Sequence, residues 1–202
     1  MLTTLKNAFK IKEIRQKILF TLGMLVVIRI GSQLPVPGVD TKFFSQWFAQ
    51  QTGGAFSFFD AITGGSFLNM SILALNINPY ITSSIIIQLL TIAIPALEEM
   101  QRDGEEGRKK IQEYTRYLTV GLALMQSAAM AIGFGGQGLL LDFTALNVIV
   151  TVATMTAGSA VLMWIGERIT ENGVGNGISI VLLFNILSTI PSDMISLYER
   201  FM

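Results

Sequence analysis

The sequence predicts an all-α, polytopic membrane protein with five membrane-spanning helices and one short, half-inserted helix. The first observation is the composition: of 202 residues, 51% are hydrophobic and only 14% are charged, whereas a soluble globular protein carries about 25% charged residues. The second observation is that long uncharged stretches interrupt the few charges, as is typical of membrane-spanning segments, because a charge inside the bilayer is costly. The chain contains no Cys and no His, which excludes disulfides, Cys/His metal sites and catalysis that depends on His.

The first predicted span covers residues 18–34. Its only charge, Arg29, lies near the far end, from which a long side chain can reach the membrane interface. Residues 1–17 form the predicted cytoplasmic amino-terminal segment, and residues 35–55 form an external loop.

The next uncharged stretch, the 37 residues between Asp60 and Glu98, is too long for one straight helix and short for two. Gly64-Gly65 interrupts it, and Pro79 begins a helix more readily than it continues one. We therefore predict a short, partly inserted helix over residues 56–70 and a full span over residues 77–95. Backbone at membrane depth that does not span must lie inside protein or beside a water-filled cavity.

Three further uncharged stretches of 25, 24 and 21 residues follow Arg116, Asp142 and Glu171. Each can cross about 30 Å of hydrocarbon as a helix. The remaining spans are predicted over residues 117–135, 143–166 and 177–192, joined on the cytoplasmic side by a loop over 96–116 and a turn over 167–176.

The distribution of basic residues tests this topology. Eleven of the 14 Lys and Arg residues lie in segments 1–17, 96–116 and 167–176. Cytoplasmic loops are enriched in Lys and Arg, so the amino terminus is predicted to be cytoplasmic. If the 37-residue stretch crossed the membrane twice, the basic loop 96–116 would lie outside, which supports a segment that enters and does not cross.

Three sequence motifs resemble those of the SecY family of protein-conducting channels. They are NPYITSSIIIQLL at residues 78–90, GEEGRKKIQEYTR at 104–116 and MWIGERITENGVGNGIS at 163–179. The resemblance implies a multi-pass protein of the bacterial plasma membrane. In this family the central subunit passes unfolded secretory proteins through a pore and releases signal or transmembrane segments sideways through a lateral gate. The family has ten spans in two inverted halves, of which this chain would supply the amino-terminal half.

The resemblance also implies roles for individual residues. The pore ring of branched aliphatic side chains maps to Ile81, Ile85, Ile178 and Leu182. The plug that closes the pore maps to residues 56–70, with Phe58, Phe59, Asp60, Ala61, Ile62, Thr63, Gly64, Gly65, Ser66, Phe67, Leu68, Asn69 and Met70 as its site residues. Gln88 and Gln126 map to one side of the lateral gate, and Arg108, Lys109 and Lys110 map to a contact with cytoplasmic partners. For Asn147 and Asn185 we expect hydrogen bonds between helices.

The implied partners are a second SecY half, either on another chain or as an antiparallel copy, together with SecE, SecG, the SecA ATPase, the ribosome, a signal peptide, the unfolded polypeptide and the lipid bilayer. No cofactor, metal, nucleic-acid partner or enzymatic activity is expected. Two alternatives remain: half of a small-solute secondary transporter, because such carriers also use broken helices, and a truncated or designed SecY half that acts as a structural scaffold. The five predicted spans contain no Asp or Glu, which disfavours a transporter that binds Na⁺ or protons.

Overall fold

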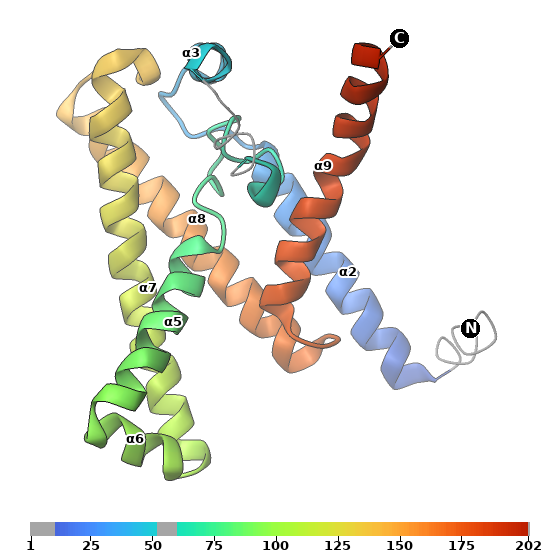
Figure 1. Cartoon of the computed structure of the whole chain (residues 1–202), viewed down its shortest axis with the longest axis vertical. Coiled ribbons are helices and arrows are strands. Elements are labelled where there is room, and N and C mark those ends of the chain that lie inside the picture. Colours follow the sequence, from blue (N-terminus) through green and yellow to red (C-terminus); the bar gives the residue numbers. More distant parts are fainter. Residues whose placement is uncertain (1–10, 52–59, 202) are drawn as a thin grey trace.

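The structure is a computed structural model that describes residues 11–51 and 60–201. Within these ranges the regular structure is helical, so the all-α prediction is confirmed (Figure 1). The elements are α2 (Lys12–Gln33), α3 (Thr41–Gln51), α5 (Asn78–Ala93), α6 (Pro95–Arg102), α7 (Glu105–Phe134), the π-helical turn η1 (Gly135–Leu139), α8 (Ala145–Asn172) and α9 (Gly177–Phe201).

Two helical segments of the described chain are long and apolar enough to cross a membrane, namely Glu105–Leu139, which joins α7 and η1, and Ala145–Asn172. The helices α5 and α6 meet at an angle of 102° and count as a third span if the bent pair is taken as one. The apolar part of α9, Gly177–Ile190, is shorter. The number of five spans therefore stays a prediction.

The segment expected as a cytoplasmic loop, residues 96–116, is mostly helical in the structure. The helix α6 begins at Pro95, and α7 begins at Glu105, twelve residues before the predicted span. Only Asp103 and Gly104 separate the two helices, with Gly104 at φ +80°. Charged residues favour helix as readily as apolar ones do, so an uncharged stretch marks the apolar part of a helix and not its end.

Helix ends also differ elsewhere from the sequence-based bounds. The helix α3 lies in the expected external loop, α8 continues to Asn172, and α9 continues to Phe201. In the expected plug helix only residues 60–63 of the described part are helical, and residues 64–77 form consecutive turns apart from one isolated bridge residue. Positive φ angles at Gly64, Gly65 and Met70 explain this, because an α-helix cannot continue through them.

The side chains of α7 are arranged oppositely to those of a soluble helix. Its buried residues are small, and include Thr119, Ala123, Ser127 and Ala131 at intervals of four. Large apolar side chains point outward instead: Leu124, Met125 and Ile132 have 52%, 67% and 62% of their surface exposed. Small residues let neighbouring helices approach closely, and outward apolar side chains suit lipid.

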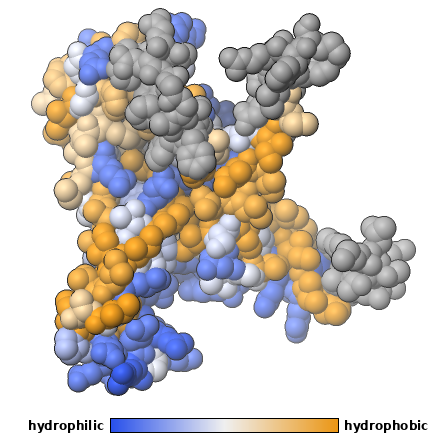
Figure 2. Space-filling model, viewed as in Figure 1, coloured by the Kyte–Doolittle hydropathy of each residue, from blue (hydrophilic) through white to orange (hydrophobic). Residues whose placement is uncertain are grey.

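Hydrophobic side chains are exposed over other parts of the surface as well. Figure 2 shows hydrophobic side chains across the middle of the molecule, while hydrophilic ones gather at the end formed by α6 and the beginning of α7. This distribution is typical of a membrane protein in which one end, here α6 and the beginning of α7, lies in water.

Two apolar clusters form the core, and the turn-rich segment 64–77 contributes to both. One cluster contains Phe67, Met70 and Leu75, and the other contains Leu73 and Ile77. Figure 1 shows this segment in the centre of the molecule, between α5, α9 and α2. The middle of the structure is therefore irregular backbone enclosed by helices.

Candidate pore ring, plug and gate

Three of the four pore-ring candidates line one hollow. Ile81 and Ile85 come from α5, Ile178 comes from the first turn of α9, and Tyr80, Ser84 and Asn176 complete the lining of a space of about 250 Å³. The spacing of four places Ile81 and Ile85 on one face of α5. Ile85 is 52% exposed, so an apolar side chain at this hollow is left without full cover.

Leu182 lies one helical turn after Ile178 on α9 and is half-buried. It is not among the residues that line the hollow. The structure therefore brings Ile81, Ile85 and Ile178 together around one hollow. Leu182 lies on the same helix as Ile178 but does not line this hollow.

The plug candidates from Asp60 to Met70 are described, whereas Phe58 and Phe59 lie outside the described residues. Thr63, Gly64, Ser66, Phe67 and Met70 are buried, and Asn69 is exposed. The ring of Phe67 packs edge-on against that of Phe44 in α3, with 5.6 Å between the centroids. The described part of the plug is thus packed into the fold on several sides.

Polar contacts hold the same segment. The guanidinium Nη1 of Arg29 on α2 donates a hydrogen bond to the carbonyl oxygen of Gly64 at 2.8 Å. The carboxylate Oδ1 of Asp60 accepts the backbone N–H of Leu68 at 3.0 Å, which closes the turns between these residues into a loop. Arg29 therefore contacts the plug candidate Gly64, although the sequence indicated only that it reaches the membrane interface.

Asn76 joins the turn-rich segment to α9. Its side chain is 1% exposed, its Nδ2 donates to the carbonyl oxygen of Ile62 at 3.2 Å, and its Oδ1 accepts from Nδ2 of Asn185 at 3.1 Å. The expectation for Asn185 was a bond between helices, and the partner found lies in a turn. Asn147 donates locally to the carbonyl oxygen of Asp142 at 2.9 Å, so the expected bond from that residue between helices is not observed.

The two lateral-gate candidates differ in burial and in their neighbours. Gln126 on α7 is half-buried and lines a space of about 480 Å³ with Phe67, Leu75, Asn78, Thr82, Ala129 and Met130. Gln88 on α5 is exposed and is 3.4 Å from the hydroxyl of Ser84. Gln126 thus faces a space between α5 and α7 next to the plug residue Phe67, and Gln88 does not line it.

Arg108, Lys109 and Lys110, the candidates for a contact with a cytoplasmic partner, are all exposed in the first turns of α7. The helix α6 packs beside this part of α7. Helical structure fixes these three cations on consecutive positions of one rigid element, so they point in different directions around α7.

An ion pair that the sequence did not indicate connects α7 and α8. Arg116 Nε donates to Glu167 Oε1 at 2.9 Å, and Gln112 Nε2 donates to the same oxygen at 3.1 Å. The side chain of Glu167 is only 8% exposed, whereas that of Arg116 is 42% exposed. Gln112 and Arg116 lie one turn apart on α7, but Glu167 is 55 and 51 positions away from them, so only the packing of α7 against α8 brings it to them.

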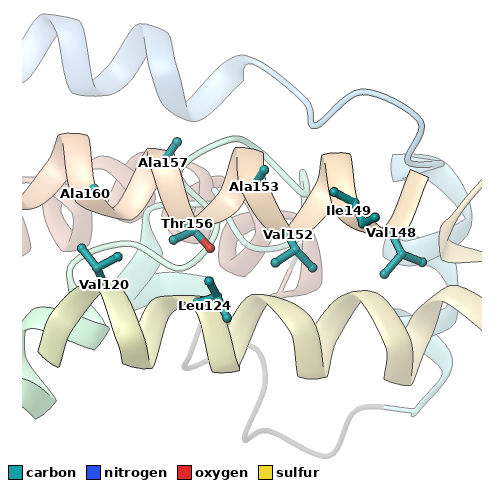
Figure 3. A pocket seen from close by; sticks show the side chains of 9 residues that line it. All are labelled: Val120, Leu124, Val148, Ile149, Val152, Ala153, Thr156, Ala157 and Ala160. Carbon is teal, nitrogen blue, oxygen red and sulfur yellow. The ribbon is translucent and has the colours of Figure 1, made fainter. Parts of the chain in front are cut away.

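A third hollow, of about 520 Å³, lies between α7 and α8 (Figure 3). Its lining is Val120 and Leu124 from α7 and Val148, Ile149, Val152, Ala153, Thr156, Ala157 and Ala160 from α8. The hydroxyl of Thr156 is 3.0 Å from that of Ser127, so even this polar side chain is paired. The apolar lining suits lipid or another apolar surface, in contrast to the ring hollow, which includes Ser84 and Asn176.

Comparisons with known proteins agree with this architecture. The SecY family model matches residues 71–201. The chain is 43% identical to "Protein translocase subunit SecY" of Streptomyces scabiei over 99% of its own length and 48% of that protein. It is 42% identical to the protein of the same name from Staphylococcus carnosus, over 99% of its own length and 47% of that protein.

The fold resembles a solved structure described as "Sec61 in the Canine ribosome-channel complex from the endoplasmic reticulum", with a TM-score of 0.61 and 22% identity, over 87% of this chain and 37% of that chain. At this identity the likeness concerns the fold alone. The chain spans about half the length of the curated relatives it matches. With a family model over more than half of its residues and relatives above 40% identity over nearly its whole length, the chain belongs to the SecY family.

Proposed function

We propose that this chain forms the amino-terminal half of a protein-conducting channel, and that Ile81, Ile85 and Ile178 are part of the ring that surrounds the moving polypeptide. The observation that carries the proposal is the hollow shared by these three side chains, which come from two helices far apart in sequence. The family and the fold support a channel, and the geometry supports this location for its narrow part.

An aliphatic ring suits such a function for a physical reason. A narrow apolar constriction excludes ions because water does not fill it readily. The same side chains offer no hydrogen bonds that would select one sequence over another, so chains of any composition can pass. In this proposal Leu182 joins the ring when the carboxy-terminal half is present, and Gln88 and Gln126 lie along the lateral gate.

In the proposed resting state, residues 56–70 close the pore. The burial of Phe67 and Met70, together with the bond from Arg29 to the carbonyl of Gly64, supports a plug that is held in place. The proposed substrates are unfolded secretory proteins with their signal peptides, and membrane segments that leave sideways into lipid.

The proposed orientation places the amino terminus and the α6–α7 junction in the cytoplasm of a bacterial cell, as the basic residues favour. Arg108, Lys109 and Lys110 would then face a ribosome or the SecA ATPase, and SecE and SecG would complete the channel in the bilayer. The channel itself catalyses no reaction in this proposal, and the partner supplies the energy.

Crosslinking to an arrested polypeptide tests the proposal. The chain has no native Cys, so a single Cys at position 81, 85 or 178 is the one thiol in this part of the channel, and the channel without it is the background control for a thiol-specific photo-crosslinker. We expect each of the three to crosslink to a polypeptide arrested during translocation through the complete channel.

The matched control is Ile149→Cys, which replaces the same residue type in the hollow between α7 and α8. This position is expected to crosslink to lipid and not to the polypeptide. Crosslinks from position 149 with none from 81, 85 or 178 would move the polypeptide path to the other hollow and refute the proposed one.

A further inference from the structure

Asn76 occupies an unusual position between the plug and α9. It is one of two non-glycine residues with positive φ in the described chain, at +53°, a conformation that Asn tolerates better than most residues. Its backbone carbonyl accepts the hydroxyl of Ser159 on α8 at 3.3 Å, and its N–H donates to the carbonyl of Leu73 at 2.8 Å. The backbone of Asn76 is therefore fixed, and its side chain is left to make specific contacts.

Both contacts of that side chain cross between elements. The amide nitrogen binds the carbonyl oxygen of Ile62 in the plug, and the amide oxygen binds Nδ2 of Asn185 on α9. Asn185 is itself only 4% exposed. One primary amide thus links the plug to α9, and neither of its polar ends has water to replace a lost partner.

The plug and α9 also touch directly beside this link. A β-carbon added to Gly64 would be 3.2 Å from the carbonyl oxygen of Asn185 and 3.1 Å from the hydroxyl of Ser188. A displacement of α9 therefore disturbs both the packing of Gly64 and the Asn76–Asn185 bond. The bond from Arg29 to Gly64 comes from α2 and does not depend on α9.

We propose that the Asn76–Asn185 pair is a latch that keeps the channel closed by coupling the plug to the position of α9. At rest, Asn185 holds the amide of Asn76 in the orientation that binds Ile62. When α9 moves outward, the amide oxygen of Asn76 loses its donor in a buried site, and the side chain turns to find another partner and releases Ile62. This inference rests on the proposed channel function and adds a mechanism for its opening.

Resting single-channel recordings of the complete channel in planar bilayers test the latch. Asn76→Gly removes both side-chain bonds and suits the positive φ, Asn185→Ala removes only the donor to Asn76, and Asn185→Asp keeps the shape of the side chain but replaces the donor by an acceptor. We expect each variant to raise the frequency of spontaneous opening by about tenfold, which corresponds to the loss of one buried hydrogen bond.

The control variant is Asn69→Ala, which removes the same residue type from an exposed position of the plug, and its opening frequency is expected to stay at the wild-type value. The double variant Asn76→Gly/Asn185→Ala is expected to open no more often than Asn76→Gly alone, because both residues act through one bond. Additive free-energy effects, or unchanged openings in both Asn185 variants, would overturn the latch. The Asn185 variants keep Asn76 and its backbone bonds, so they decide the question even if Asn76→Gly does not fold.

The outcome also separates the latch from the proposed function. Crosslinking from a Cys at position 81, 85 or 178 to an arrested polypeptide is expected in every variant and tests the proposed channel function by itself. These crosslinks without a rise in the resting openings of the variants refute the latch alone. An absence of the crosslinks from all three positions refutes the channel function as well.

Discussion

Gly158 on α8 lies so close to the carbonyl oxygen of Ile72 that a β-carbon at this position would overlap it. The contact joins a helix to the turn-rich segment 64–77, where no side chain could fit between the two backbones. Gly121 on α7 is also a glycine inside a helix, but a β-carbon there meets no atom within 4 Å. Substitutions at the two positions therefore distinguish the cost of a steric clash from the intrinsic effect of glycine on helix stability.

We predict that Gly158→Ala lowers the free energy of unfolding by about 1–3 kcal/mol, because the backbone of Ile72 has to move. Gly121→Ala is expected to leave stability unchanged or raise it by about 0.5–1 kcal/mol, since alanine loses less conformational entropy in a helix. Chemical denaturation in mixed micelles measures both. An equal loss in the two variants would show that the contact between Gly158 and Ile72 is not what matters.

A second prediction at this scale concerns Ile81 and Ile85. Replacement of either by Asn is expected to raise the resting ion current by about tenfold or more, because an amide in the narrow part of the pore lowers the free energy of wetting by about 1–3 kcal/mol. Ile149→Asn, in the hollow between α7 and α8, is the control and is expected to leave the current unchanged. Planar-bilayer recordings of the complete channel measure all three variants, and equal currents would contradict the ring assignment.

The sequence led to the ring residues only through motifs and to the half-inserted segment 56–70 also through its charges and breaks, and it left the contacts of both open. Ile81 and Ile178 are 97 positions apart, and nothing in their spacing predicts a shared hollow. The sequence marked Arg29 as a charge near the end of a span and Pro79 as the start of a helix, yet the hydrogen bonds of Arg29 and Asn76 to the segment 60–70 depend on how residues 64–77 fold. A contact between distant residues follows from tertiary packing, which a local pattern does not determine.

At the scale of the elements, a buried carboxylate joins two largely apolar helices, α7 and α8. Glu167 is buried and receives both Arg116 and Gln112. On α6, by contrast, Arg102 and Glu98 form an exposed i,i+4 ion pair, and their side chains are 77% and 47% exposed, respectively. A buried carboxylate that loses its partner is expensive, whereas an exposed pair contributes little.

We therefore predict that Arg116→Ala lowers the free energy of unfolding by about 1–3 kcal/mol. Arg102→Ala is expected to lower it by less than about 0.5 kcal/mol. Thermal or chemical unfolding of the two variants under the same detergent conditions gives the comparison. If both substitutions cost the same small amount, Glu167 does not depend on Arg116 and the buried pair is not a structural link between α7 and α8.

The limits of sequence reasoning at this scale have a clear physical origin. Uncharged stretches locate apolar segments, and the spans predicted over residues 117–135, 143–166 and 177–192 coincide for most of their length with α7, α8 and α9. They do not locate helix ends, since Glu105 to Arg116 is charged and still helical. The helix α3 was not predicted. The turns over residues 64–77 were not predicted either, because they depend on positive φ angles at Gly64, Gly65, Met70 and Asn76 and on contacts with the surrounding helices.

At the scale of the whole molecule, many large apolar side chains point outward, while small and polar side chains join the two apolar clusters in the interior. Large aliphatic residues such as Ile92, 81% exposed, and Leu146, 67% exposed, would be unfavourable in water and suit a lipid environment. The irregular plug segment lies at the centre, where helices supply the hydrogen bonds that lipid lacks. A central segment held by a few specific bonds and enclosed by lipid-facing helices is an arrangement suited to a channel that opens.

The most direct test of this account is a cryo-electron microscopy structure of the complete channel with a polypeptide arrested during translocation. The account predicts polypeptide density between α5 and α9, within contact distance of Ile81, Ile85 and Ile178, and a displaced segment 60–70. Density that instead followed the hollow between α7 and α8, with the plug still bonded to Arg29 and Asn76, would contradict it.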